Sequence, residues 1–238
     1  MTSPSGVSPS TLARRKFEVN FFRPQKILKK FNSLYFSDGQ SAPADNTSVR
    51  PFNISIPDSE LADIRRRLAQ ARFIDHLPDT AFHYGMNSEK LIDLVKYWNG
   101  TYDWRAQEAK LNAASQFKTQ IEGIDVHFVH VKASSKATKV YPLLSVHGWP
   151  SSFLEIYRAL PLLTEPDASG LAFEVIAPSI PGYGYSEGAH KTGLDPTAAG
   201  RMFATLMKDR LGFSKYFLQG NDWGSIITRN IAILYPEK

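Results

Sequence analysis

A short strand followed by a sharp turn and a helix is the strongest constraint that this sequence places on its fold. Residues 216–219 form a short apolar run, residues 220–224 read Gly-Asn-Asp-Trp-Gly, and residues 225–235 are patterned as a helix. A strand-to-helix turn of this kind crowds its neighbours, so small residues are needed on both sides of the position it exposes. Gly220 and Gly224 meet that need. The pattern predicts a nucleophile elbow that presents Asp222 with a helix N-terminus behind it.

The side chain at the elbow is a carboxylate, whereas serine is the usual occupant of this position. A carboxylate nucleophile attacks an alkyl carbon and forms an ester, which water then cleaves. An aspartate before a helix is also a common N-cap, and taken alone this segment favours the cap for Asp222. The next motif favours the nucleophile.

The second motif is His147-Gly148-Trp149-Pro150, which follows a run that is typical of a buried strand. Gly148 lets the backbone turn freely, and a His-Gly loop after an early strand is where this arrangement places an oxyanion-hole donor. The expected donors are the backbone N–H groups of Trp149 and Trp223, about 3 Å from the developing oxyanion. We expect His147 to hold the loop rather than to act as a base. The bond before Pro150 is compatible with either isomer.

A third segment, residues 173–186, combines a buried strand with the loop Pro-Gly-Tyr-Gly-Tyr-Ser. Loops at the carboxyl ends of strands are where open α/β sheets bind ligands. We therefore expect this loop to lie near the other two motifs.

Strand and helix patterns alternate through the second half of the chain. The predicted order is strand 140–146, helix 153–163, strand 173–177, helix 196–211, strand 215–219 and helix 223–235. Such alternation predicts an α/β fold with a doubly wound, mostly parallel sheet. The predicted domains are a basic flexible leader at 1–48, helices followed by a hairpin at 49–131, and the α/β core at 132–238.

The helical region at 49–115 has its own local signals. Ser88 is the expected N-cap of a helix that stops at Gly100. We interpret the aromatic side chains of this region as part of a hydrophobic core.

Composition excludes several classes of protein. The sequence has no cysteine, so a disulfide framework and a thiolate metal site are excluded. No run of 18 apolar residues is present, so a membrane span is not expected. Residues 1–40 hold seven basic and two acidic side chains and so carry the whole net charge of +5. We expect a solvated tail on a cytoplasmic protein; organelle targeting or membrane-surface contact is the alternative.

The three motifs, in this order and spacing, resemble the microsomal-type epoxide hydrolases of the α/β-hydrolase superfamily. Upstream strings are similar to the N-terminal region of that family: Arg50-Pro51-Phe52, Tyr97-Trp98, Tyr102-Asp103-Trp104-Arg105 and the run from Ile124 to His130. The resemblance covers residues 49–238.

The resemblance implies a function and a site. Asp222 is the implied nucleophile, and the Trp149 and Trp223 amides are the implied oxyanion hole. The implied substrate is a small-molecule epoxide, released as a vicinal diol, with no cofactor and no metal. No nucleic-acid partner is expected.

The family's catalytic histidine, the acid that orients it and two lid tyrosines lie downstream of the nucleophile. Only 16 residues follow Asp222, and none is a histidine. We therefore expect this chain to be the front portion of such an enzyme, weakly active or inactive on its own.

Two other hypotheses stay open. A haloalkane dehalogenase uses the same Asp-Trp elbow to displace halide, although the region 49–131 favours the epoxide enzyme. A non-catalytic binding module derived from this fold is the other alternative.

Overall fold

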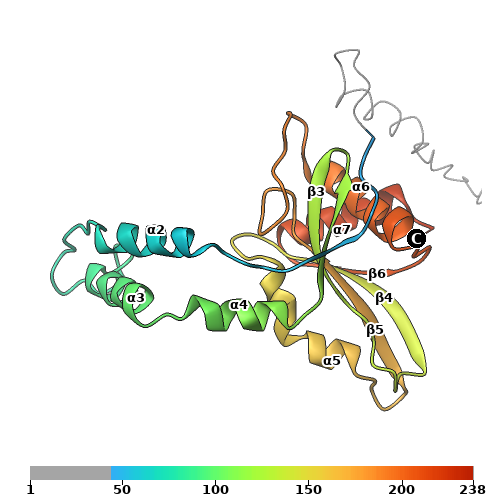
Figure 1. Cartoon of the computed structure of the whole chain (residues 1–238), viewed down its shortest axis with the longest axis horizontal. Coiled ribbons are helices and arrows are strands. Elements are labelled where there is room, and N and C mark those ends of the chain that lie inside the picture. Colours follow the sequence, from blue (N-terminus) through green and yellow to red (C-terminus); the bar gives the residue numbers. More distant parts are fainter. Residues whose placement is uncertain (1–43, 238) are drawn as a thin grey trace, which may run out of the picture. The chain divides into compact units, whose positions relative to one another are not determined.

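The computed structural model describes residues 44–237, and the elements are shown in Figure 1. The strands are β1 (Arg50–Phe52), β2 (Gln116–Ile121), β3 (Ile124–Val131), β4 (Lys139–Val146), β5 (Leu171–Pro178) and β6 (Phe217–Gly220). The helices are α2 (Asp58–Ala69), α3 (Ser88–Gly100), α4 (Trp104–Asn112), η1 (Phe153–Arg158), α5 (Leu160–Thr164), α6 (Pro196–Thr205), η2 (Leu206–Arg210) and α7 (Trp223–Leu234). Most of the predicted leader lies outside the described residues.

The six strands form one mixed sheet in the order β1-β2-β3-β5-β4-β6. β4 pairs in parallel with both β5 and β6, and these three strands carry the loops of the three motifs. The remaining pairs are antiparallel. The hairpin between β2 and β3 turns through Glu122 and Gly123, which both have positive φ, 54° and 78°, as a tight two-residue hairpin requires. The predicted α/β fold is confirmed.

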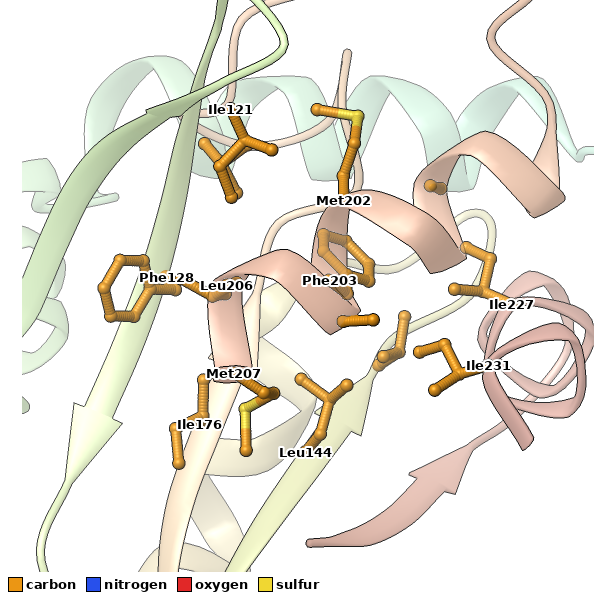
Figure 2. Close-up of a cluster of buried hydrophobic side chains, with 14 of the residues drawn as sticks. Ile121, Phe128, Leu144, Ile176, Met202, Phe203, Leu206, Met207, Ile227 and Ile231 are labelled. Carbon is orange, nitrogen blue, oxygen red and sulfur yellow. The ribbon is translucent and has the colours of Figure 1, made fainter. Parts of the chain in front are cut away.

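Helices cover both faces of the sheet, as a doubly wound fold requires. On one face, α6, η2 and α7 pack on the sheet through the cluster shown in Figure 2, which includes Ile121, Phe128, Leu144, Ile176, Met202, Phe203, Leu206, Met207, Ile227 and Ile231. On the other face, η1 and α5 pack through Phe153, Ile156 and Leu160 against Val129, Leu143 and Val175. The two clusters fix the sheet from both sides and so fix the strand ends that carry the motifs.

The helices of the N-terminal region differ from the expectation of a packed core. None of the residues of α2, α3 or α4 is buried. Tyr97 and Trp98 are 52% and 46% exposed, and they line a groove of about 340 Å³ together with Leu61, Ile64 and Leu94. The prediction that the aromatic side chains of this region belong to a core is therefore wrong for Tyr97 and Trp98. Phe52 and Trp104, by contrast, are partly buried and pack against the cluster that contains Val129 and Val175. Helical periodicity identifies an apolar face but does not show what covers it.

Three predicted boundaries also need correction. Asn87 rather than Ser88 caps α3, because its side chain accepts a hydrogen bond from the Lys90 amide. The helix predicted at 153–163 is two segments, since Pro161 cannot donate a backbone hydrogen bond and the α-helix restarts beside it. The helix predicted at 196–211 ends in one π-helical turn, η2. Within residues 44–237, no helix is both long and apolar enough to cross a bilayer.

Candidate active site around Asp222

The turn between β6 and α7 is tightly packed and strained at Asp222. The backbone of Asp222 has φ 46° and ψ −122°, a conformation that is costly for any residue with a Cβ. A Cβ on Gly220 would lie 2.4 Å from the Gly224 carbonyl oxygen, and one on Gly224 would lie 2.0 Å from that of Val146. Glycine is thus required at both positions, because the turn is as crowded as the sequence motif predicts.

The Asp222 side chain does not cap α7. Its carboxylate makes no capping hydrogen bond, which would come from the second or third residue of that helix; the only N–H of α7 that acts on it is that of Trp223, directly next to it. Its Oδ1 instead accepts a hydrogen bond of 2.8 Å from the backbone N–H of Trp149, in the loop after β4. The capping interpretation is wrong, and the two motifs meet at this carboxylate.

The charge of Asp222 is stabilised by backbone dipoles. The N–H of Trp149, and after it the N–H of Trp223, lower the pKa of the Asp222 carboxyl below its usual value, because hydrogen bonds to the ionised form favour ionisation. Asp222 is therefore a carboxylate at neutral pH. Asp222 itself is exposed, and the two tryptophans whose N–H groups face its carboxylate, Trp149 and Trp223, are 66% and 44% exposed. The described residues therefore leave the carboxylate open to solvent.

His147 orients the peptide that donates to Asp222. Its Nε2 accepts a hydrogen bond of 3.1 Å from the Ile180 N–H, so in the neutral ring Nδ1 carries the hydrogen. Nδ1 then donates to the Gly148 carbonyl oxygen at 3.1 Å. The C=O of Gly148 and the N–H of Trp149 belong to one trans peptide and point in opposite directions. Holding the carbonyl on the His147 side therefore directs the N–H towards Asp222.

Close approach between the two loops depends on Gly148. A Cβ at that position would lie 2.6 Å from the Asp222 Cβ and 2.8 Å from its Oδ1. The bond between Trp149 and Pro150, which the sequence left open, is cis.

The loop after β5 forms the third side of the site. Tyr183 packs on the His147 ring with centroids 5.3 Å apart. With Ile180, Leu194, Trp223 and other residues it lines a cavity of about 200 Å³ beside the elbow. The hydrogen bond from Ile180 to His147 was not predicted from the sequence, because a backbone donor leaves no mark on residue identity.

Two buried histidines make stability sensitive to acid. Burial lowers the pKa of His147. The pKa of His127 is lowered to about 3, mainly by burial and to a smaller extent by the positive charge of Lys118. Lys118 faces His127 from β2, and Tyr185 faces it from the loop after β5. In the unfolded chain a histidine titrates near pH 6.5. The folded pKa is the lower one, so this contribution to stability is complete above pH 6.5 and is lost as the pH falls towards 3.

We therefore expect the free energy of unfolding to fall below pH 6.5 by up to about 1.4 kcal/mol per pH unit from His127 alone. Urea denaturation at several pH values measures this slope. The variant His127→Gln, which does not titrate, should be less stable at pH 7 but should show a shallower slope. Equal slopes in both proteins would contradict the assignment.

Comparison with known proteins agrees with this architecture. Residues 49–156 match the family model described as "Epoxide hydrolase N terminus", and residues 141–238 match the one described as "alpha/beta hydrolase fold". Epoxide hydrolase 1 of Sus scrofa is 46% identical over 221 residues, which cover 87% of this chain and 48% of the relative. Juvenile hormone epoxide hydrolase 2 of Ctenocephalides felis is 44% identical over 205 residues, covering 85% and 44%.

Solved structures give the same result. The crystal structure of juvenile hormone epoxide hydrolase from the silkworm Bombyx mori superimposes with a TM-score of 0.77 at 37% identity, covering 81% of this chain and 51% of that one. Aspergillus niger epoxide hydrolase gives 0.70 at 31% identity with the same coverage. The chain spans about half the length of the curated relatives it matches.

The sheet, the elbow and the loop after β4 together define an α/β-hydrolase fold. Within that class, the chain belongs to the microsomal-type epoxide hydrolase family.

Proposed function

We propose that the protein hydrolyses small-molecule epoxides to vicinal diols through an ester formed on Asp222. The observation that carries this proposal is the 2.8 Å hydrogen bond from the Trp149 N–H to one oxygen of an ionised carboxylate at a strained elbow. The relatives named as epoxide hydrolases support the same class of substrate.

The two carboxylate oxygens of Asp222 have different roles in this mechanism. Oδ1 is held by the Trp149 amide, which leaves Oδ2 as the attacking atom. As the bond between Oδ2 and an epoxide carbon forms, the bond between that carbon and the ring oxygen breaks. Its electron pair moves to the ring oxygen, which takes up a proton from solvent water. Oδ1 is then the carbonyl oxygen of the new ester.

The second step uses the same backbone donors. Water attacks the ester carbonyl carbon, and negative charge develops on Oδ1. Donors within 2.7–3.1 Å of a developing oxyanion stabilise it strongly, and the Trp149 N–H already lies 2.8 Å from Oδ1. Collapse of the intermediate releases the diol with the oxygen that Oδ2 supplied.

His147 does not supply the base for that water. Its Nε2 lone pair is taken by the Ile180 N–H and its Nδ1 is bonded to the Gly148 carbonyl. General-base assistance is worth about 10²–10⁴-fold. We therefore expect residues 1–238 alone to form the ester faster than they cleave it.

Incubation of the chain with an aryl epoxide, followed by intact-mass and diol measurements, tests the proposal. The expected result is an adduct with slow release of diol. Chloride release from a chloroalkane at a comparable rate would favour the dehalogenase alternative. Absence of both adduct and diol would favour a binding module.

The location of the protein remains a prediction from composition. The charge of residues 1–40, on which membrane-surface contact and organelle targeting depend, lies outside the described residues. We propose a cytoplasmic location for the protein.

A further inference from the structure

A second histidine, His127 on β3, is fully buried and takes no part in the chemistry described above. Three aromatic rings surround it, those of Phe52, Phe153 and Tyr185, with centroids 5.3, 4.8 and 5.5 Å away. Both ring nitrogens are nevertheless hydrogen-bonded, Nδ1 to the Ser179 hydroxyl at 2.9 Å and Nε2 to the Gln116 side-chain oxygen at 2.9 Å. A polar ring in an apolar site is costly unless its partners are maintained.

The partners of His127 fix its tautomer. The Gln116 amide nitrogen donates to the Leu111 carbonyl oxygen at 2.9 Å, so the amide oxygen faces the ring and can only accept. Nε2 of His127 therefore carries the hydrogen, and Nδ1 accepts from the hydroxyl of Ser179. The Tyr157 hydroxyl donates to the same Leu111 carbonyl at 2.7 Å. The hydrogen bonds thus form one directed chain from the end of α4 to the loop after β5.

Both ends of that loop are bonded to His127. The Ser179 N–H donates to the His127 carbonyl oxygen at 2.9 Å, and the His127 N–H donates to the Ser186 hydroxyl at 2.9 Å. The Ser186 hydroxyl in turn donates to the Ser179 carbonyl oxygen at 2.8 Å. Of these hydrogen bonds and that to the Ser179 hydroxyl, only the last uses the His127 side chain, so a change of the ring nitrogens removes it while the backbone hydrogen bonds stay. The Tyr185 ring of the same loop also packs on the His127 ring.

Ser179 is followed directly by Ile180, whose N–H donates to Nε2 of His147. His147 then holds the Gly148 carbonyl and so aims the Trp149 N–H at Asp222. We propose that His127 is a positioning residue of this site, which acts through Ser179 to hold Ile180 and so fixes the tautomer and orientation of His147.

A purely space-filling role for His127 makes a different prediction. In that case any substitution acts through lost packing, and the larger replacement is the better one. In a positioning role, the effect of a substitution depends on whether it keeps a hydrogen-bond acceptor for the Ser179 hydroxyl. An asparagine amide oxygen reaches the place of Nδ1 and keeps that acceptor, whereas a glutamine amide nitrogen reaches the place of Nε2 and keeps only the donor to Gln116.

The variants His127→Asn and His127→Gln therefore separate the two roles. The rate at which an aryl epoxide labels Asp222 should fall about 10- to 100-fold in His127→Gln, because small misplacements of reacting groups are costly. His127→Asn should retain more of the rate despite its smaller side chain. Ser179→Ala, which removes the partner hydroxyl and disturbs packing less, should behave like His127→Gln. His130→Gln is the matched control: His130 lies on the same strand and its Nε2 is bonded to Glu174 at 2.6 Å, away from the loop.

The labelling measurement rests on the proposed function, so a second readout is independent of it. Ring ¹⁵N chemical shifts should report the Nδ1–H tautomer of His147 in the wild-type chain, in His127→Asn and in His130→Gln. In His127→Gln and Ser179→Ala they should report a mixture of tautomers. If the wild-type chain is not labelled, the proposed function fails while the tautomer measurement still decides this inference. An unchanged His147 tautomer in both His127→Gln and Ser179→Ala would overturn it, as would slower labelling in His127→Asn than in His127→Gln.

Discussion

Replacement of Asp222 by alanine is expected to abolish covalent labelling of the chain by an aryl epoxide. The substitution removes the carboxylate that two backbone N–H groups keep ionised, and no other described carboxylate accepts a hydrogen bond from the Trp149 amide. Alanine keeps the Cβ and adds no atom, so it introduces no new clash at the elbow and the fold should be retained. Intact mass after incubation measures the label, and circular dichroism checks the fold.

Asp209→Ala is the matched control for this prediction. Asp209 is an exposed aspartate in η2 and has no place at the elbow. Labelling of that variant should equal labelling of the wild-type chain. Adduct formation that survives the loss of Asp222 would contradict its assignment as the nucleophile.

Substitution of Gly224 by alanine is expected to cause the largest loss of stability among single-methyl changes at the site. The added Cβ would lie 2.0 Å from the Val146 carbonyl oxygen and 2.7 Å from that of His147. Both atoms are backbone, so relief requires α7 to move away from the end of β4. Overpacking typically costs about 1–3 kcal/mol and occasionally more, and we expect a value at or above the top of that range.

Gly188→Ala provides the comparison, because a Cβ there meets no atom within 4 Å. Its effect should stay within about 0.5 kcal/mol, as is usual for surface changes. Urea denaturation of both variants measures the difference. If the two substitutions cost the same, then α7 does not pack against β4 as closely as described.

The sequence predicted the parts of the site that local patterns encode. The elbow at Asp222 and the loop at Gly148 are each marked by small residues beside a strand end, and the parallel sheet brings those ends together. Trp149 and Asp222 are 73 positions apart and still meet, because β4 and β6 are neighbours in the sheet. The alternation of strands and helices is also a local pattern, and it predicted the α/β fold class.

Other parts depend on contacts that a sequence pattern does not encode. His127 and Ser179 are 52 positions apart. In the sequence pattern of β3, the position of His127 looks like that of any inward-facing strand residue. Its role emerges only from the partners of both ring nitrogens. Conversely, the aromatic side chains of residues 49–115 suggested a core, but residue identity does not show what covers a helix face, and Trp98 is 46% exposed.

A single turnover in ¹⁸O-labelled water tests the ester mechanism most directly. With the chain in excess over an aryl epoxide, each Asp222 carboxylate reacts at most once. Water that attacks the ester carbonyl leaves its oxygen in the carboxylate, while the diol takes the oxygen that Asp222 supplied. We predict ¹⁸O in the peptide that contains Asp222 and unlabelled diol. Labelled diol with an unlabelled Asp222 peptide would mean that water attacks the epoxide directly, and would contradict the proposed function.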